Sequence, residues 1–266
     1  MRKTFQYKGC SVSYQSGGKG KTVMLVHGFA EDGRIWDEQA PVLKQHCRLI
    51  IPDLPGSGHS GYNDTLNSIE DYADCLHELL KVENVEHCII LGHSLGGYIT
   101  LAFAEKYGEK LSGYGFIHST AFADSEEKKQ NRLKGIKMIG EYGSYAFIKS
   151  TTPNLFSVRF KEKFAEKIDA LIKNGVNFKK EALQQYYYAM MVRPDRTHVL
   201  RNTSIPVLFV AGTEDIAAPL GDVLQQMYLP KTSYIHILQN TAHMSMWEAT
   251  EAVNKHVSIF IEDVEK

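Results

Sequence analysis

Apolar positions along the chain follow two different rhythms, and each rhythm predicts one type of element. Short runs that are almost continuously apolar are typical of strands buried on both faces of a sheet. Such runs recur along the chain at Thr22–His27, Arg48–Pro52, His87–Leu91, Gly113–His118, Val207–Ala211 and Ser233–Leu238. Two shorter strands at the start of the chain, Thr4–Lys8 and Ser11–Gln15, are expected to form a hairpin.

Longer segments between these runs have the apolar spacing of a helix. In Ile69–Lys81 the apolar residues recur every three or four positions, and Ser68 stands where an N-cap is expected. Leu95–Tyr107 and Met244–Ile261 are further helix candidates. The alternation of strands and helices predicts an α/β fold, with a mostly parallel sheet flanked by helices.

The stretch 120–203 interrupts this alternation. It contains helix-like segments such as Glu126–Tyr142 and Ser157–Asn174, and it is dense in aromatic residues and methionine. No Gly/Ser linker bounds it, so we interpret it as an inserted helical cap and not as a separate domain. The predicted organisation is a core of residues 1–119 and 204–266 with a cap of residues 120–203. The charged run Glu126–Lys129 is expected to be a solvated helix face.

Composition and charge narrow the range of partners. The chain has 266 residues, with 30 Lys and Arg against 31 Asp and Glu, for a formal net charge of −1. This balance favours neither a nucleic acid nor an anionic membrane as a partner. The basic N-terminus lacks the apolar stretch of a signal peptide, and no run reaches the roughly 20 apolar residues of a spanning helix, so we expect a cytoplasmic protein. The four cysteines lack metal-ligand spacing and are expected to be thiols, with Cys47 and Cys88 packed as small hydrophobes.

The strongest chemical signal is the sequence Leu91–Gly97, which reads L-G-H-S-L-G-G. It is a G-x-S-x-G nucleophile elbow with an apolar strand before it and a helical segment after it. The strand-to-helix turn is tight enough to require Gly92 and Gly96, and it presents Ser94 at a helix N-terminus. A glycine-rich turn with an incidental serine is the alternative, and the flanking strand and helix argue against it.

A second signal, H-G-F at residues 27–29, closes an earlier apolar strand. An oxyanion hole needs two N–H donors, and the candidates are the backbone groups of Phe29 and of Leu95, the residue after the nucleophile. His27 is expected to be structural. The turn-rich loop Pro52–Ser60 is interpreted as architectural, with Asp53 and His59 bonded within it.

These motifs together resemble the α/β-hydrolase superfamily, in its lid-bearing branch of small esterases, lactonases and C–C bond hydrolases. The matching motifs are H-G-F, D-L-P-G-S-G-H-S, G-H-S-L-G-G, A-G-T-E-D at 211–215 and T-A-H-M at 241–244. The resemblance covers the core and leaves the cap unmatched. It implies a catalytic triad in the chain order serine, acid, histidine, with no metal and no organic cofactor.

By this resemblance the acid follows a late strand and the base follows the last one. Asp215, in the loop after Val207–Ala211, is therefore the predicted acid, and Glu214 and Asp124 are its rivals. His243, in the loop after Ser233–Leu238, is the predicted base, whereas His236 lies inside that strand and is expected to be packed.

The aromatic and methionine residues of the cap have two interpretations. They either pack the cap onto the core or line an apolar substrate pocket over Ser94; the candidates for lining are Tyr145, Phe156, Tyr187 and Met190. The leading function is hydrolysis of a small, fairly apolar carboxylic ester through an acyl-enzyme. Lactone or C–C bond hydrolysis, perhydrolysis and acyl transfer use the same triad, and a ligand-sensing receptor of this fold is the rival from another class. The family's dehalogenases and most of its epoxide hydrolases place Asp at the position of Ser94, which disfavours those two reactions.

Overall fold

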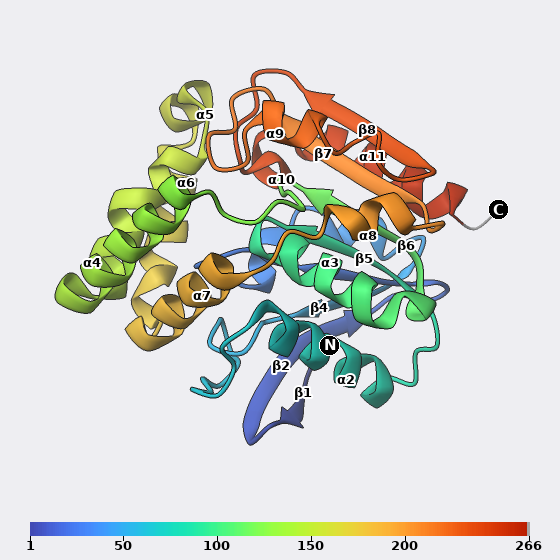
Figure 1. The fold of residues 1–266 in the computed structure, drawn as a ribbon, viewed down its shortest axis with the longest axis horizontal. Helices are drawn as coiled ribbons and strands as arrows, with labels where there is room; N and C mark the ends of the chain where they lie inside the picture. The colour runs from blue at the N-terminus through green and yellow to red at the C-terminus, as the bar shows by residue number, and fades with distance from the viewer. Residues whose placement is uncertain (265–266) are drawn as a thin grey trace.

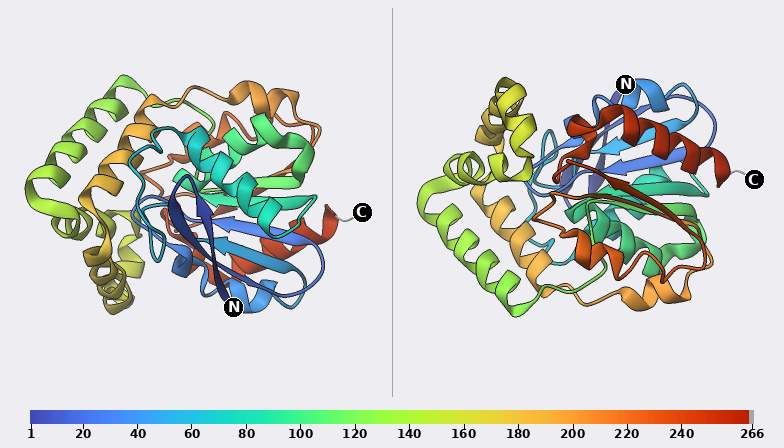
Figure 2. Two further views of the ribbon diagram at one scale, coloured as in Figure 1. Left: turned by 90° about the horizontal axis from the view of Figure 1, so that it is seen from below. Right: turned by 90° about the horizontal axis from the view of Figure 1, so that it is seen from above.

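The computed structural model describes residues 1–264 and consists of one mixed sheet with helices on both faces and a helical cap at one end (Figures 1 and 2). The sheet order is β1-β2-β4-β3-β5-β6-β7-β8. Its strands are β1 (Arg2–Tyr7), β2 (Cys10–Gly17), β3 (Thr22–Val26), β4 (Arg48–Pro52), β5 (Cys88–His93), β6 (Leu111–Ile117), β7 (Val207–Gly212) and β8 (Ser233–Leu238). The hairpin β1–β2 and the pair β2–β4 are antiparallel, and the remaining pairs are parallel.

The apolar runs at β3 to β7 form strands because both faces of the sheet are covered there. The edge strand β8, also expected to be buried on both faces, is not: Ile235 is 44% and Ile237 39% exposed. Alternate residues of β3 enter different cores: Val23 and Leu25 pack on one face of the sheet, Met24 and Val26 on the other. Helices α2 (Ile69–Val82) and α3 (Leu95–Tyr107) cover the second face, while α1 (Ala40–Leu43) and α11 (Thr250–Asp263) cover the first. An alternating polar face would be buried here without partners, which is why these strands are apolar throughout.

The strand order reverses at β3, and this reversal creates the place for a site. From β3 the chain forms β4 on one side and then returns to form β5 on the other side of β3. At such a switch point the loops after adjacent strands diverge and leave a crevice at the carboxyl ends. The loops after β3 and β5 begin at His27 and Ser94, the two segments that the sequence marks as chemical.

The cap is the helical insertion between β6 and β7 (Figure 1). Its helices are α4 (Glu126–Thr151), α5 (Val158–Lys163), α6 (Ala165–Asn174) and α7 (Lys180–Val192). The insertion ends with α8 (Thr197–Asn202), which lies against helix α3 of the core (Figure 1). Helices α4 and α7 pack along each other. Tyr186 of α7 attaches the cap to the core, since its hydroxyl donates to the Pro55 carbonyl oxygen over 2.7 Å and lies 2.9 Å from the Ser57 hydroxyl.

The predicted fold class is confirmed, and Ser68 caps α2 by accepting from the Asp71 N–H. Two expected helices are each divided in the structure. Met244–Ile261 becomes α10 (Ser245–Glu248) and α11, and Ser157–Asn174 becomes α5 and α6 with Phe164 non-helical between them. Apolar spacing continues through such breaks, so periodicity alone does not locate them. The short α9 (Leu220–Leu224) follows the loop after β7, and within the described part of the chain no helix has the length and apolar character needed to cross a membrane.

Candidate active site

Ser94 occupies the turn between β5 and α3 in a strained backbone conformation. Its φ of 49° and ψ of −113° lie in a region that side chains disfavour. A Cβ on Gly92 would lie 2.2 Å from the Gly96 carbonyl, and one on Gly96 would lie 2.4 Å from the Val26 oxygen. Both distances are far below contact, so this turn is closed to any residue but glycine at the two positions. The geometry is that expected of a nucleophile elbow.

Asp215 and His243 meet beside this turn. The two oxygens of Asp215 lie 3.0 and 2.9 Å from His243 Nδ1. Asp215 Oδ1 also accepts from the backbone N–H groups of Ala217 and Ala218, each over 2.9 Å. Both side chains are buried, which fixes the carboxylate and leaves the other nitrogen of the imidazole, Nε2, for a reacting group.

Charge at this pair follows from burial and hydrogen bonding. Burial by itself would raise the pKa of Asp215, but its contacts with His243 and His118 outweigh burial and hold the pKa well below its usual range. Burial lowers the pKa of His243, yet the Asp215 carboxylate more than compensates and raises it. The arrangement therefore keeps Asp215 ionised and stabilises the imidazolium that proton transfer to His243 would create.

A second histidine, His118, contacts the same carboxylate and has no counterpart in the sequence prediction. It follows β6, has a φ of 55°, and its Nδ1 lies 2.8 Å from Asp215 Oδ2. Burial lowers its pKa to about 4, so it is neutral near pH 7 and its Nδ1–H donates to Asp215. The only sequence signal for this residue is its place after a strand next to β7.

Glu31 and His93 form a second buried pair that sequence reasoning missed. Glu31 Oε2 accepts from the Gly28 N–H over 2.6 Å and lies 2.9 Å from His93 Nδ1. His93 Nε2 lies 3.0 Å from the carbonyl oxygen of His243 and must donate to it, because that oxygen can only accept. Burial by itself would raise the pKa of Glu31, but His93 and the Gly28 N–H outweigh burial and lower it. The pair links the loop after β3 to the loop that holds the candidate base.

The loop with the predicted oxyanion donor is held by the cap. The ring of Phe29 stacks on that of Tyr187 in α7, with centroids 4.2 Å apart and planes 10° apart. Phe147 of α4 meets Phe29 edge-on at 6.2 Å. Leu95 is the first residue of α3 and is buried. The cap therefore packs directly onto the segment whose backbone N–H is the candidate oxyanion donor.

A cavity of about 290 Å³ brings most of the predicted residues together. Ser94, His243, Phe29, Tyr187 and Met190 all line it. The rest of its lining is contributed by Glu31, Tyr98, Lys128, Asn131, Arg132, Leu155, Ile216 and Ala217.

Two cap residues expected at the pocket lie elsewhere. Tyr145 is 41% exposed on α4. Phe156 is buried away from the cavity, stacked on Phe160 with centroids 5.2 Å apart, and its neighbour Leu155 lines the cavity in its place. Aromatic composition does not reveal which side of a helix or turn faces a pocket.

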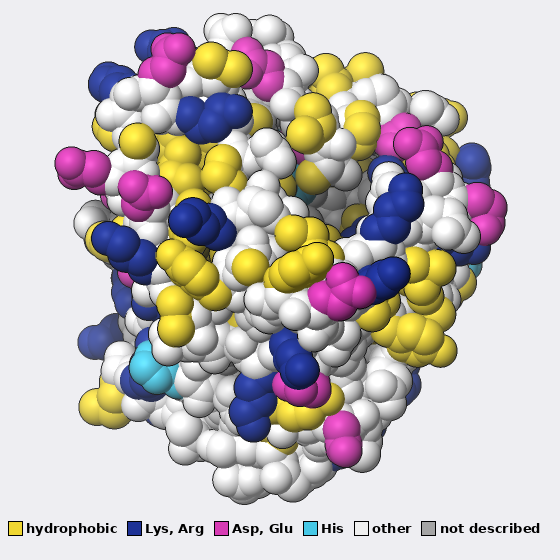
Figure 3. All heavy atoms as spheres, turned by 90° about the vertical axis from the view of Figure 1, so that its left-hand side faces the viewer, with side chains coloured by type: hydrophobic (Ala, Val, Ile, Leu, Met, Phe, Trp, Pro, Cys, Tyr) yellow, Lys and Arg dark blue, Asp and Glu magenta, His cyan; other side chains and the backbone are white. Residues whose placement is uncertain are grey.

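The lining is also less apolar than expected. Lys128, Asn131 and Arg132 stand at i, i+3 and i+4 on α4, and all three reach the cavity. The expectation that Lys128 belongs to a solvated face therefore needs correction, because one side of this helix turn faces Ser94's cavity. Viewed onto the cap, Lys and Arg side chains are dispersed among hydrophobic ones (Figure 3).

The rival residues have other partners. Glu214 is exposed, and Asp124 is buried in ion pairs with Arg132 and Arg193. His27 is structural as expected, since its Nε2 accepts from the Leu54 N–H over 2.9 Å. Asp53 accepts from the His59 N–H over 3.0 Å within the loop after β4.

His236, expected to be packed, stacks on His256 at 3.6 Å between centroids. Cys47 and Cys88 are buried as expected.

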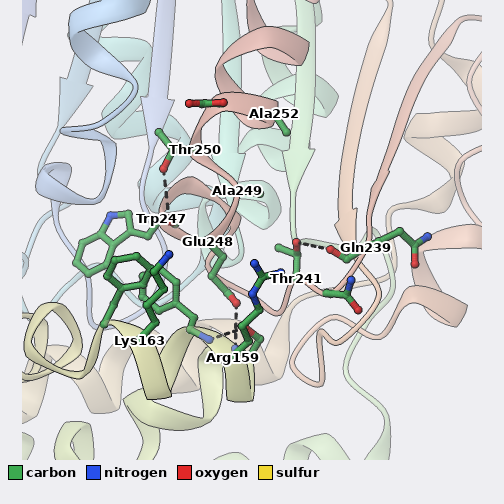
Figure 4. A pocket seen from close by; sticks show the side chains of 14 residues that line it. Arg159, Lys163, Gln239, Thr241, Trp247, Glu248, Ala249, Thr250 and Ala252 are labelled. Atoms are coloured by element: carbon green, nitrogen blue, oxygen red, sulfur yellow. Dashed lines mark hydrogen bonds between the residues drawn. The ribbon is translucent and has the colours of Figure 1, made fainter.

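Among residues 1–264 one trio has metal-ligand geometry, namely His118, Asp215 and His243, whose donor atoms lie within 4.8 Å of one another. These atoms already satisfy each other by hydrogen bonds, which suits an acid–base pair with a supporting histidine. A larger cavity of about 520 Å³ lies between α5 and the α10–α11 region (Figure 4). Arg159, Lys163, Trp247 and Glu248 line it, and none of the predicted catalytic residues does.

The chain is similar in sequence and fold to known hydrolases. Residues 21–136 match the sequence model of a family described as "alpha/beta hydrolase fold". RutD of Yersinia enterocolitica, provisionally named a carbamate hydrolase, is 27% identical over 220 residues, which are 78% of this chain and 75% of that protein. An esterase from Thermogutta terrifontis, solved with malate bound, is 26% identical with a TM-score of 0.93 and full coverage of both chains. The enol-lactonase from Burkholderia xenovorans LB400 shares the fold at 20% identity, with a TM-score of 0.91 over 98% of this chain and 100% of that one.

Proposed function

This chain belongs to the α/β-hydrolase superfamily and is a hydrolase, and from that premise we propose that it cleaves small carboxylic esters through a covalent acyl-serine intermediate. Ser94 is the nucleophile, His243 the general base and Asp215 the residue that orients the base. The observation that supports this most directly is the hydrogen bonding of His243 Nδ1 to Asp215, at 2.9 and 3.0 Å, beside a cavity that His243 shares with Ser94.

In the first half-reaction His243 Nε2 takes the proton of the Ser94 hydroxyl while Oγ bonds to the ester carbonyl carbon. The carbonyl oxygen becomes an oxyanion, and the backbone N–H groups of Phe29 and Leu95 are the donors we assign to it. Each such donor contributes about 10²–10³ in kcat in comparable enzymes. The C–O bond to the alcohol then breaks, and the imidazolium returns its proton to the leaving oxygen.

In the second half-reaction water replaces the alcohol. His243 takes a proton from the water, whose oxygen bonds to the acyl carbon. The bond from the acyl carbon to Ser94 Oγ then breaks, and the imidazolium returns its proton to Oγ as the acid is released. Asp215 keeps the Nδ1–H tautomer throughout, because its two oxygens accept from that side of the ring. A lactone is a cyclic ester, so the same residues would open it.

The test is turnover on p-nitrophenyl esters of increasing acyl length and on simple lactones, together with labelling by a fluorophosphonate. We expect sustained turnover, labelling at Ser94, and losses of about 10⁴-fold or more in Ser94→Ala and His243→Ala. A Ser94→Ala protein that retains a tenth of the activity would refute the mechanism. Turnover that stops after one cycle on every ester and lactone would favour the ligand-sensing alternative.

A further inference from the structure

The charged side chains on the cap side of the Ser94 cavity indicate which class of substrate it can bind. Lys128 and Arg132 both line it, one turn apart on α4. A pocket for a wholly apolar ester has no use for two cations, and burying part of a guanidinium costs free energy unless something compensates it.

The charge of Arg132 is not cancelled by its own ion pair. Its Nε–H and one Nη2–H donate to Asp124, which leaves its Nη1 donors outside this pair. Arg193 Nη1 donates to the same carboxylate over 2.7 Å. Two guanidinium groups therefore share one carboxylate, and the cluster Arg132–Asp124–Arg193 carries a net charge of +1.

The surroundings of this cluster are confined. The side chain of Asp124 is fully buried and that of Arg193 is 3% exposed, whereas Arg132 is 17% exposed. The guanidinium of Arg193 lies over the Tyr98 ring, 3.7 Å from its centroid. Arg132 is thus the member of the cluster whose charge faces the cavity.

The other charges at the cavity do not offset this excess. Glu31 lies on the core side of the cavity, in the loop after β3, where its Oε2 accepts from the Gly28 N–H and contacts His93. Lys128 Nζ lies 3.4 Å from Asp222, which balances it. Asp215 belongs to the opposite, core side of the site and is shared by two histidines. The uncompensated charge is therefore a single positive one on the cap side.

We propose that this face of the cavity binds a carboxylate of the substrate, so that the ester cleaved at Ser94 is a monoester of a small dicarboxylic acid or an ester of similar charge. One carboxylate balances the single net charge of the cluster. Arg132 supplies a planar donor group suited to carboxylate oxygens, and Lys128 and Asn131 add donors from the same helix face. The cavity of about 290 Å³ is at the lower end for ligand pockets, which limits the acid to a few carbons.

This inference rests on the proposed esterase function for its rate prediction but not for its binding prediction. The probes are the monomethyl esters of succinic, glutaric and adipic acid, each compared with the neutral ester in which an amide replaces the free carboxylate. Binding is measured by calorimetry on Ser94→Ala, and kcat/KM on the unmodified chain by acid release. We expect the best carboxylate to be favoured over its amide by about 10- to 100-fold in both measurements, as for other hydrogen bonds to charged groups.

Matched variants locate the effect on α4. Arg132→Gln keeps a donor for Asp124 but removes the excess charge, and we expect it to abolish most of the preference, measured as the ratio of kcat/KM for carboxylate and amide within the same variant. Lys129→Gln also removes one positive charge from α4. Lys129 pairs with Glu126 and does not line the cavity, so this variant should leave the preference intact. Lys128→Gln gives a second measurement should Arg132→Gln fold poorly, with a smaller loss expected.

The outcomes separate the two proposals. Equal or tighter binding of all three amides by Ser94→Ala would overturn the carboxylate site, even if the unmodified chain hydrolyses them well. Selective carboxylate binding without any hydrolysis would uphold the site and count against the esterase. A loss of preference in Lys129→Gln as large as in Arg132→Gln would show that the effect is long-range charge and not this site.

Discussion

Replacing Ser94 with glycine should inactivate the protein and stabilise it at the same time. The φ of 49° and ψ of −113° at Ser94 are disfavoured for any residue with a Cβ, at a cost of about 1–3 kcal/mol. Glycine removes that cost, while its greater freedom in the unfolded chain returns about 0.4–1 kcal/mol. Ser94→Ala loses the same Oγ but keeps the Cβ and the strain. We therefore expect Ser94→Gly to exceed Ser94→Ala in free energy of unfolding by about 0.5–2 kcal/mol.

Equilibrium urea unfolding of the two variants measures this difference, and thermal midpoints provide a second readout at roughly 2–4 °C for each kcal/mol. Both variants should be inactive, so the comparison is free of catalytic effects. Ser258, inside α11, provides the control. Ser258→Gly should be less stable than Ser258→Ala by about 1 kcal/mol, because glycine is disfavoured in a helix interior. Should Ser94→Gly prove no more stable than Ser94→Ala while the Ser258 pair behaves normally, the elbow is not strained and our account of Gly92 and Gly96 fails with it.

Two further predictions concern the base and the cap. Since His243 must be neutral to accept a proton, kcat/KM should rise with pH through the pKa of His243. Asp215→Asn removes the carboxylate that raises this pKa. We expect its activity to fall by about 10⁴-fold and the acidic limb of the remaining activity to move to lower pH. Glu214→Gln should leave the profile in place, and a larger loss there than in Asp215→Asn would reverse the assignment. Tyr187→Leu should change the acyl-length profile because this ring lines the cavity and stacks on Phe29, whereas Tyr145→Leu, at a 41% exposed position, should not. Identical profiles for both variants and the unmodified chain would mean that the cap only packs.

Much of the core was predictable because its signals are local. The strands at Arg48–Pro52 and Ser233–Leu238 and the helix Leu95–Tyr107 coincide with the predicted ranges. A buried strand such as Arg48–Pro52 needs an unbroken apolar run, and a helix needs apolar residues every three or four positions. The elbow glycines are equally local, since their role is set by a turn of a few residues. Helix breaks are less visible: Ser157–Asn174 is expected to be one helix, yet it is divided at Phe164, whose φ is −133° and ψ 37°.

The loops that carry Ser94, Asp215 and His243 could be predicted from the sequence, but the residues that contact them could not. His118 and Asp215 are 97 residues apart, and Glu31 and His93 are 62 apart. Each pair exists because loops after neighbouring strands of the sheet end at the same edge, and strand order is a property of the sheet as a whole. The apolar periodicity of one segment does not indicate which residue of a distant segment will contact it.

The cap shows the same division between what a sequence determines and what packing decides. Its sequence determines that it is helical and rich in aromatic residues. Which side of α4 and α7 faces Ser94 depends on how the two helices cross and on where Tyr187 meets Phe29, and both depend on contacts with the core. That is why Tyr187 and Met190 reach the cavity and Tyr145 does not. The net charge beside the cavity also depends on packing. It can be counted only when the structure shows that Arg132 and Arg193 share the carboxylate of Asp124.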